Sequence, residues 1–492
     1  MTKRAIEQLD AHGPSTSETA PVTGPGDQPS YPRSRILATP FGLSIRAGTS
    51  ASAGAKHFYT IVKADLLIPG ASEPIPHGAL VIEDKIIEWV GEQRDLPGKY
   101  VSAPHRDVSV PYLMPGLWDV HTHFLAGSDA AYVSFITEHP ASAGASLAKA
   151  CWESLQRGVT SVRDLAGFGC EVARVVNEGI ISGPNIYSSG ACLSQTAGHG
   201  DVFPLPAGDV LLNLGVSTVT PGHFGANASM LVDGVDECRR AVRLQIRRGA
   251  KVIKVLASGG IMSRDDNPLY AQFDSSELEC MVQEANRQGR AVAAHVHGKP
   301  GILAAVNAGV TTVEHVSFAD DECIQLIKEK GTVYVATRTA MDVLLVLGRK
   351  GFLPKENWEK VQLVAASHLT AYKLAIKSGV PIALGSDFSP GFNMAVEIEH
   401  AVRCGMSTLE AIKAATANGP LCVGSQAPRT GQLKVGYEAD VIAVAENPVE
   451  DVKVLQKHDN ITWVWKGGRL FKGPGVGPWG EDYQLRDDLG LD

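Results

Sequence analysis

Paired histidines stand out at two places in the chain. His121 and His123 lie in the run VHTHF, and His295 and His297 lie in AHVHG. Because successive residues of a strand point to opposite faces, two histidines separated by one residue project to the same side. Two imidazoles on one side can bind the same ion, so each pair is a candidate metal site. One such pair is a weak signal, since two exposed histidines or two satisfied core histidines would look the same.

Other ionisable residues also end apolar runs. His315 lies near the end of TTVEHVSF, and Asp387 lies near the end of PIALGSDF. Asp387 could merely cap a turn, because a Pro-Gly pair follows it. Beside a metal-activated water, a carboxylate can instead bind the cation, orient the nucleophile and accept its proton. We interpret Asp387 as such a ligand and general base.

Lys254 stands among apolar residues in VIKVLASGG. Burial there penalises the charged ammonium and lowers its pKa. A salt bridge with a neighbouring carboxylate is one explanation. The other is a neutral amine that captures carbon dioxide, so that Lys254 becomes an anionic carbamate able to bridge two cations. The histidines and the aspartate at the other strand ends favour the carbamate.

The elements that must position these side chains are apolar runs alternating with helix-period stretches between Leu113 and about Gly424. Helical candidates such as VDECRRAVRLQIRRG end at Gly, as helices commonly do. Such alternation predicts an α/β fold, a (β/α)8 TIM barrel, whose active site lies at the carboxyl ends of the strands. The eight candidate strands are LMPGLWDVHTHF, VTSVRDLAG, NIYSSGACLS, VIKVLASGG, AVAAHVHG, TTVEHVSF, TVYVATRT and PIALGSDF.

Short β-rich runs flank the barrel on both sides. FYTIVKADLLIPG and ALVIEDKIIEWVG precede it, and GQLKVGYEADVIAVAENP and ITWVWKGGRLF follow it. Unpaired strands need partners, so we expect one small β-sandwich domain built from N- and C-terminal segments. The predicted organisation is a flexible tail at 1–56, β-domain parts at 57–112 and 425–480, the barrel at 113–424 and a C-terminal tail at 481–492.

Composition excludes several classes of partner. The chain has 492 residues, a formal charge of −8 and 44% hydrophobic residues, which suits a large folded protein and provides no basic surface for nucleic acid or an anionic membrane. No signal peptide or membrane span is recognised, and the 8 cysteines form no C-x-x-C pair. We therefore expect a cytoplasmic protein with a small-molecule substrate. Homo-oligomers are common among such barrels, but the sequence does not determine the number of subunits.

Seven segments together resemble the amidohydrolase superfamily of metal-dependent hydrolases, in that family's order from about Phe58 to Trp479. Within the superfamily, the chain is similar to the imidazolonepropionase-like and Xaa-Pro dipeptidase branch. The segments are MPGLWDVHTHF, VIKVLASGG, AHVHG, VEHVS, ALGSDF, EAIKAATANGP and GYEADVIAVAENP.

This resemblance implies a binuclear centre and assigns each ligand to an ion. One divalent ion would be held by His121, His123 and Asp387, the other by His295 and His315, with carboxylated Lys254 bridging both. Nitrogen and oxygen ligands without thiolates favour Zn²⁺, with manganese, cobalt or nickel as substitutes in vitro. His297 would contact the substrate rather than a metal.

The expected reaction is hydrolysis of an amide in an N-acyl amino acid or dipeptide. A hydroxide bridging the ions would attack the carbonyl, with His297 at the oxyanion and Asp387 passing the proton to the departing amine. One alternative is a cyclic amide hydrolase of the imidazolonepropionase type. Another, from a different class, is a metal-containing barrel that serves as a scaffold without turnover.

Further polar residues near the same rim are open to two interpretations. His199 in QTAGHGD could line the substrate mouth or bond to backbone. Tyr334 and Arg338 in TVYVATR could hold a substrate carboxylate, although Arg338 could equally form an internal salt bridge. The acidic run in SRDDNP, residues 263–268, could form a lid or a solvated loop.

Overall fold

The computed structural model describes residues 37–38, 44–45, 57–125, 139–216 and 228–481. In the N-terminal unit, strands β1 (Leu37–Ala38) and β2 (Ser44–Ile45) pair antiparallel. Apart from these strands and Glu481, the tails predicted at 1–56 and 481–492 lie outside the described residues. Everything below concerns the second unit, Lys56–Asp492.

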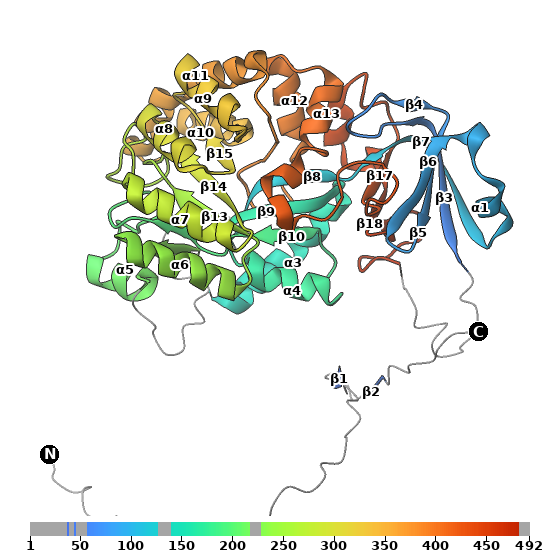
Figure 1. Cartoon of the computed structure of the whole chain (residues 1–492), viewed down its shortest axis with the longest axis horizontal. Helices are drawn as coiled ribbons and strands as arrows, with labels where there is room; N and C mark the ends of the chain where they lie inside the picture. Colours follow the sequence, from blue (N-terminus) through green and yellow to red (C-terminus); the bar gives the residue numbers. More distant parts are fainter. Residues whose placement is uncertain (1–36, 39–43, 46–56, 126–138, 217–227, 482–492) are drawn as a thin grey trace, which may run out of the picture. The chain divides into compact units, whose positions relative to one another are not determined.

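Parallel strands form the wall of the barrel, surrounded by helices (Figure 1). Each strand is almost entirely buried, as expected for parallel strands covered by helices. The paired strands are β8 (Leu117–Phe124), β9 (Val159–Gly167), β10 (Asn185–Ser188), β11 (Cys192–Ser194), β13 (Val252–Leu256), β14 (Ala291–Val296), β15 (Thr312–His315) and β16 (Val333–Val335).

The segment 381–388 closes the barrel between β16 and β8. On one side, the Tyr334 amide donates to the Pro381 carbonyl at 2.8 Å. On the other side, the Asp387 amide donates to the His121 carbonyl at 2.7 Å. Gly385 permits this approach, because a Cβ at that position would lie 2.6 Å from the Cβ of His121. The predicted (β/α)8 barrel is therefore observed, with its last strand next to its first.

The third predicted strand, NIYSSGACLS, is wrong in detail. It divides into β10, which pairs with β9, and β11, which pairs with β13 and with β12 (Ser229–Leu231). Gly190 separates the two halves and has a φ of 68°, a left-handed conformation that interrupts an extended strand. β12 was not predicted from the sequence.

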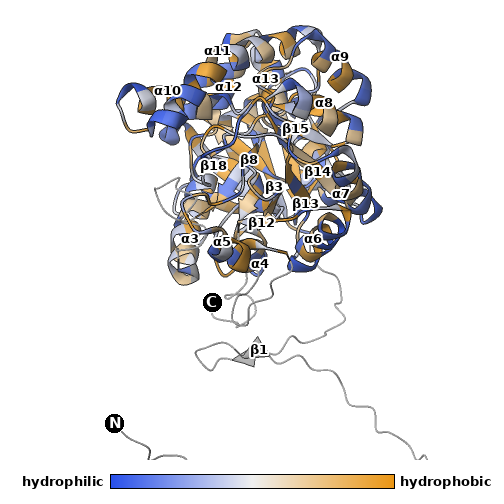
Figure 2. Ribbon diagram, turned by 90° about the vertical axis from the view of Figure 1, so that its left-hand side faces the viewer, coloured by the Kyte–Doolittle hydropathy of each residue, from blue (hydrophilic) through white to orange (hydrophobic). Residues whose placement is uncertain are grey.

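Helices cover the outside of the barrel with their apolar faces turned inward. In Figure 2, orange residues gather on the strands and blue residues on the outer turns of the helices. α6 ends at Gly249 with φ 117°, and α7 begins with a capping box between Asp274 and Glu277. The helices are α3 (Pro140–Gln156), α4 (Gly169–Asn177), α5 (Ala207–Leu214), α6 (Val235–Arg248), α7 (Ser275–Arg287), α8 (Lys299–Ala308), α9 (Asp321–Lys330), α10 (Arg338–Arg349), α11 (Lys355–Ser378), α12 (Ala395–Cys404) and α13 (Thr408–Ala414). Among the described residues, none of these helices combines the length and apolar character needed to cross a membrane.

The flanking β-rich runs form one β domain from both ends of the chain, as expected, and its strands lie in one sheet. In Figure 1 the blue strands before the barrel lie beside the red strands after it, because β7 pairs antiparallel with β17. Val62, Val110, Val441 and Trp465 share a core enclosed by this sheet. The exact domain boundaries stay a prediction. The elements of this β domain are β3 (Tyr59–Leu67), β4 (Ile75–Pro76), β5 (Gly78–Glu83), β6 (Ile86–Glu92), α1 (Gly98–Ser102), β7 (His105–Pro115), β17 (Val441–Val444), β18 (Ile461–Lys466) and β19 (Arg469–Lys472).

Candidate active site

Histidines and a carboxylate meet at the carboxyl ends of the barrel strands. Nε2 of His121 lies 3.4 Å, and Nε2 of His123 lies 2.9 Å, from Oδ1 of Asp387. One ligand atom from each of His121, His315 and Asp387 falls within 4.8 Å of the others. Two imidazole nitrogens and a carboxylate oxygen at this spacing could hold one divalent ion.

The second predicted pair of histidine ligands lies next to this group. The His295 ring centroid is 4.6 Å from that of His315, and Nδ1 of His315 is 3.9 Å from Oδ2 of Asp387. Asp387 thus lies against histidines of both predicted ligand sets, through its two oxygens. The structure brings all these side chains together, while their division between two ions stays a prediction.

Lys254 is buried in the same interior, with 2% of its surface exposed. Within the described part of the chain, no carboxylate forms an ion pair with its ammonium and no group accepts a hydrogen bond from Nζ. Burial lowers the pKa of Lys254, although Glu314 and Asp387 act in the opposite direction. The structure therefore shows no direct salt bridge for this lysine, and a buried amine without a partner fits the bridging carbamate.

The protonation states of the site also suit a cation. Burial lowers the pKa of His121 to about 4 and holds the pKa values of His295 and His315 well below their ordinary value. Burial alone would raise the pKa of Asp387, but His121, His123 and Lys254 outweigh it and bring that pKa to about 2. At neutral pH the imidazoles are neutral and the carboxylate is charged, which are the forms that bind metal. The donor set therefore fits a divalent metal centre.

Backbone strain gathers at the same strand ends. His315, Val316, Thr337 and Asp387 have φ values of 69°, 54°, 52° and 64°. A residue with a side chain rarely adopts this left-handed region, and such strain is typical of functional sites. Tertiary hydrogen bonds maintain it, including one at 2.8 Å between His315 Nδ1 and Thr337 Oγ1.

Glu314 and Arg163 are functional residues that the sequence did not reveal. Oε2 of Glu314 lies 2.8 Å from Nδ1 of His121, and Oε1 accepts a hydrogen bond from Arg163 at 2.8 Å. Arg163 Nε donates to the carbonyl of Val120 in β8 at 2.5 Å, so the Arg163–Glu314 pair is attached to that strand. A carboxylate on Nδ1 leaves Nε2 of His121 as the ligand nitrogen. Their signal in the sequence, a charged residue inside an apolar strand, is the same one that identified Lys254.

Replacing Glu314 with Gln should lower the affinity for divalent metal by about 10- to 100-fold, because His121 loses the carboxylate that orients it. Metal content after dialysis against graded chelator measures this effect, with circular dichroism to verify folding. Glu322→Gln, on the exposed side of α9, is the matched control. Unchanged metal affinity in a folded Glu314→Gln protein would show that Glu314 does not support the site.

The two histidines predicted to face the substrate lie with the cluster. The ring centroid of His297 is 5.1 Å from that of His315, and its Nδ1 is 2.7 Å from Ser317 Oγ. The ring of His199 stacks on that of His295 at 4.3 Å. Both are therefore placed where they could contact a molecule bound at the ligands.

Tyr334 and Arg338 are not placed with the histidines in this way. Tyr334 faces away from the barrel interior and stacks on Tyr372 of α11 at 6.0 Å, fully buried in the core. The predicted seventh strand ends at Val335, and the chain turns into α10 at Arg338. Arg338 forms the internal ion pair that was its alternative interpretation, with Asp342. The geometry supports neither residue as a ligand for a substrate carboxylate.

Arg338 also contacts His368, a buried histidine whose protonation should affect stability. Burial, followed by Arg338, lowers the pKa of His368 from 6.5 to about 4. As the pH falls from 6.5 to 4, the unfolded chain binds a proton here that the folded chain does not, so the folded state loses stability. Each pH unit in this window should lower the free energy of unfolding by about 1.4 kcal/mol through His368.

The variant His368→Gln should lack this contribution to the pH dependence. Between pH 7.5 and pH 5, the free energy of unfolding should fall by about 2 kcal/mol more in the wild type than in the variant, as measured by denaturant unfolding. The contributions of the other titrating groups to this pH dependence are the same in both proteins, so they cancel in the comparison. Equal losses in the two proteins would mean that His368 titrates normally in the folded state.

Comparison with known proteins agrees with this geometry. The amidohydrolase family model matches residues 112–471. The chain is 61% identical to ochratoxinase of Aspergillus niger over 426 residues, which cover 86% of this chain and 88% of that protein. The crystal structure of A. niger ochratoxinase has a TM-score of 0.84 at 60% identity and covers 87% of this chain and 99% of its own. A Xaa-Pro dipeptidase with bound methionine in the active site has a TM-score of 0.72 at 28% identity, covering 84% and 100%.

These similarities confirm the barrel fold and the resemblance drawn from the sequence motifs. The segments RAVRLQIRRGAKVIKVLASGG, SRDDNP and GPGVGPWGED predict a relative of ochratoxinase, and the 61% identity confirms it. Members of the matched family generally use divalent metal ions, and the cluster of His121, His315 and Asp387 is suited to one. The chain belongs to the amidohydrolase family and is a hydrolase that acts on amide bonds.

Proposed function

We propose that the protein is a binuclear metal-dependent amidohydrolase that releases the terminal amino acid from an N-acyl amino acid or a dipeptide. The observation that carries this proposal is the convergence of His121, His315 and Asp387 in the barrel interior that holds the partnerless Lys254. The 61% identity to a protein named ochratoxinase supports small amides resembling ochratoxin A as substrates.

The proposed metal ligands are those that the family resemblance implies, and the cluster of His121, His315 and Asp387 supports them. His121, His123 and Asp387 would bind one ion and His295 and His315 the other, with carboxylated Lys254 between them. Nitrogen and oxygen donors favour Zn²⁺. Bound divalent ions would make a water acidic and polarise the scissile carbonyl.

Asp387 would transfer the proton from the attacking water to the departing amine. Its low pKa keeps the carboxylate charged at neutral pH, so it can accept a proton from the attacking water. It would then deliver that proton to the nitrogen of the departing amine, which leaves poorly unless protonated. The backbone amide of Asp387 donates to the His121 carbonyl at 2.7 Å, which fixes the position of this residue.

His297 would contact the carbonyl oxygen of the substrate. The Ser317 hydroxyl lies against its Nδ1, and the Ser258 hydroxyl accepts a hydrogen bond from its backbone amide at 2.8 Å. These contacts hold the ring beside His295 and His315. A hydrogen bond from a preoriented imidazole would stabilise negative charge on the oxygen during attack.

A substrate panel combined with metal analysis tests the proposal. Purified protein would be incubated with ochratoxin A and other N-acyl phenylalanines, Xaa-Pro dipeptides and imidazolonepropionate, and each product quantified. We expect release of the amino acid from the acyclic amides, loss of activity with a strong chelator and recovery with Zn²⁺. Turnover of the cyclic amide alone would overturn the substrate class, and full activity without bound ions would overturn the mechanism.

A further inference from the structure

Helix α10 begins inside the molecule, shortly after β16. Its first residues, Arg338 and Thr339, are 6% and 4% exposed. The first turn of a helix leaves backbone amides without acceptors in the helix itself, and buried amides need other partners. α10 has no acidic residue in its own first turn. The acceptor must therefore come from the residue before the helix or from another part of the chain.

Thr337, the residue before α10, does not cap the helix. A threonine usually caps from an extended conformation, with its hydroxyl oxygen accepting an amide of the first turn. Thr337 instead has φ 52° and ψ 45°, a left-handed conformation that a β-branched residue rarely adopts, and its side chain makes no capping hydrogen bond. Its Oγ1 lies 2.8 Å from Nδ1 of His315, at the end of β15. The hydroxyl that would cap α10 thus contacts a proposed metal ligand.

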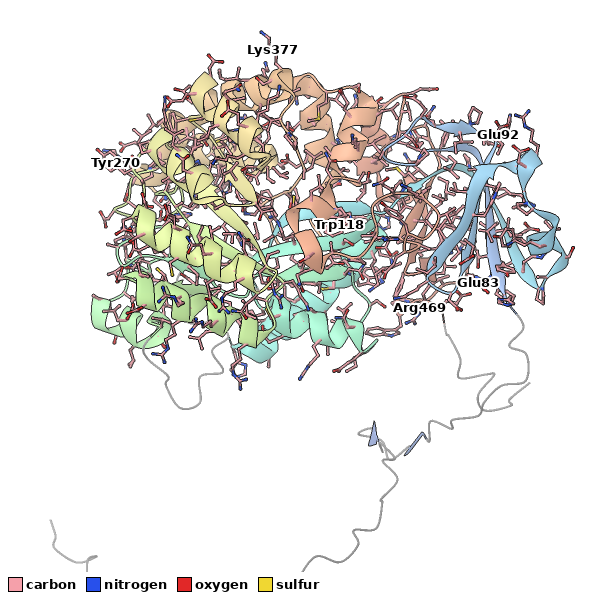
Figure 3. All side chains as sticks on the ribbon, in the orientation of Figure 1. Glu83, Glu92, Trp118, Tyr270, Lys377 and Arg469 are labelled. Atoms are coloured by element: carbon pink, nitrogen blue, oxygen red, sulfur yellow. The ribbon has the colours of Figure 1, made fainter. Side chains whose placement is uncertain are left out.

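Glu397 of α12 provides the acceptor that Thr337 does not. Its Oε1 accepts the backbone amide of Thr339. Helices α10, α11 and α12 pack against one another, and Lys377 of α11 points outward from them in Figure 3, whereas Glu397 has none of its surface exposed. Within the described residues, Oε2 of Glu397 has no hydrogen-bond partner. Capping α10 is therefore the contact that accounts for this carboxylate.

The burial of Glu397 also shows which property of its side chain the helix needs. Burial raises the pKa of Glu397 to about 7, although the amides of Thr339 and Arg338 act in the opposite direction. The positive end of the helix dipole favours the charged form, which offsets part of the cost of burial. Both the charged and the neutral form retain an oxygen that can accept an amide hydrogen. The property needed at this position is a hydrogen-bond acceptor rather than a charge.

We propose that Glu397 is a positioning residue for the metal centre: it caps α10 in place of Thr337 and so leaves the Thr337 hydroxyl to orient His315. The contacts run from α12 through the first turn of α10 to the end of β15. A hydrogen bond at Nδ1 leaves Nε2 of His315 as the nitrogen available to an ion. The role toward the metal rests on the proposed function, whereas the conformation of Thr337 does not.

The conformation of Thr337 can be tested without metal or substrate by a crystal structure of metal-free Glu397→Leu. Leucine has a similar size but accepts no hydrogen bond, so we expect Thr337 to become extended and to cap α10 itself. Its Oγ1 should then move beyond hydrogen-bonding distance of His315 Nδ1. If this variant does not fold, Glu397→Asp, whose carboxylate is one methylene shorter, provides the second measurement. A Thr337 φ that stays near 52° with the contact to His315 intact would overturn the proposal.

The affinity for Zn²⁺ measures the consequence of this positioning. Loss of a partner that orients a ligand costs about 10- to 100-fold in metal affinity, so Glu397→Leu and Thr337→Ala should each bind Zn²⁺ about tenfold or more weakly in dialysis against graded chelator. Because both variants lose the same contact, the double variant should bind no more weakly than the weaker of the two. Glu397→Gln retains an oxygen that accepts the amide and should keep wild-type affinity. Losses that add in the double variant would show that Glu397 does not act through Thr337.

The matched control is Glu410, an exposed glutamate that takes part in capping α13 and accepts the Ser407 amide at 2.8 Å. Glu410→Leu should lower the stability of the protein but leave its affinity for Zn²⁺ unchanged, which separates loss of a helix cap from loss of a positioned ligand. Wild-type affinity in folded Glu397→Leu would overturn the role toward the metal. If the wild-type protein bound no divalent ion, the proposed function would fail, while the conformation of Thr337 in the variant would still decide what Glu397 does.

Discussion

Asp387→Asn should lower kcat by about 10²- to 10⁴-fold, the range expected when a general base is removed. The amide side chain has nearly the same size and retains an oxygen that could contact a cation, but it cannot accept a proton from water. Much of the bound metal should therefore remain. Steady-state kinetics, together with elemental analysis, measure the two effects separately.

Two controls make the Asp387 result interpretable. Asp236→Asn removes an exposed carboxylate from α6 and should leave kcat unchanged. Circular dichroism tests whether Asp387→Asn remains folded. We expect that it does, because the backbone at residue 387 has a φ of 64° and asparagine tolerates that conformation. A folded, metal-loaded variant with wild-type kcat would rule out Asp387 as the proton acceptor.

Lys254→Ala should reduce activity by about 10³-fold or more, because the variant loses the only side chain proposed to bridge the two ions. Both metal content and turnover should fall. Short carboxylic acids such as acetate or propionate should restore part of the activity, since their carboxylate can occupy the space of the carbamate. This rescue separates the loss of a ligand from general damage to the core.

The matched control for Lys254 lies in the same segment. Lys251 comes just before β13 and is exposed, so Lys251→Ala should retain activity and show no response to added carboxylic acids. Wild-type metal content and activity in Lys254→Ala would exclude a bridging role. Loss of folding can be recognised by circular dichroism, and Lys254→Met, which preserves most of the buried volume, then provides the second measurement.

The barrel could be predicted from the sequence because its strands are short apolar runs separated by helices with recognisable ends. The flanking strands could also be assigned to one domain, since unpaired strands need partners, and the structure pairs β17 with β7. The third strand was predicted less accurately, because the break at Gly190 depends on how β11 packs between β12 and β13. Periodicity alone does not reveal such a change of partner.

The ionisable residues near the ends of the barrel strands could be located from the amino-acid sequence, because His121, His315 and Asp387 stand out within apolar runs. The tertiary structure decided which way other side chains face and what they touch. It turned Tyr334 outward onto Tyr372, joined Glu314 to His121, and brought Asp266 to His199. The physical reason is that strand ends follow from local hydrophobicity, whereas the partner of a buried charge is set by chain segments that meet only on folding.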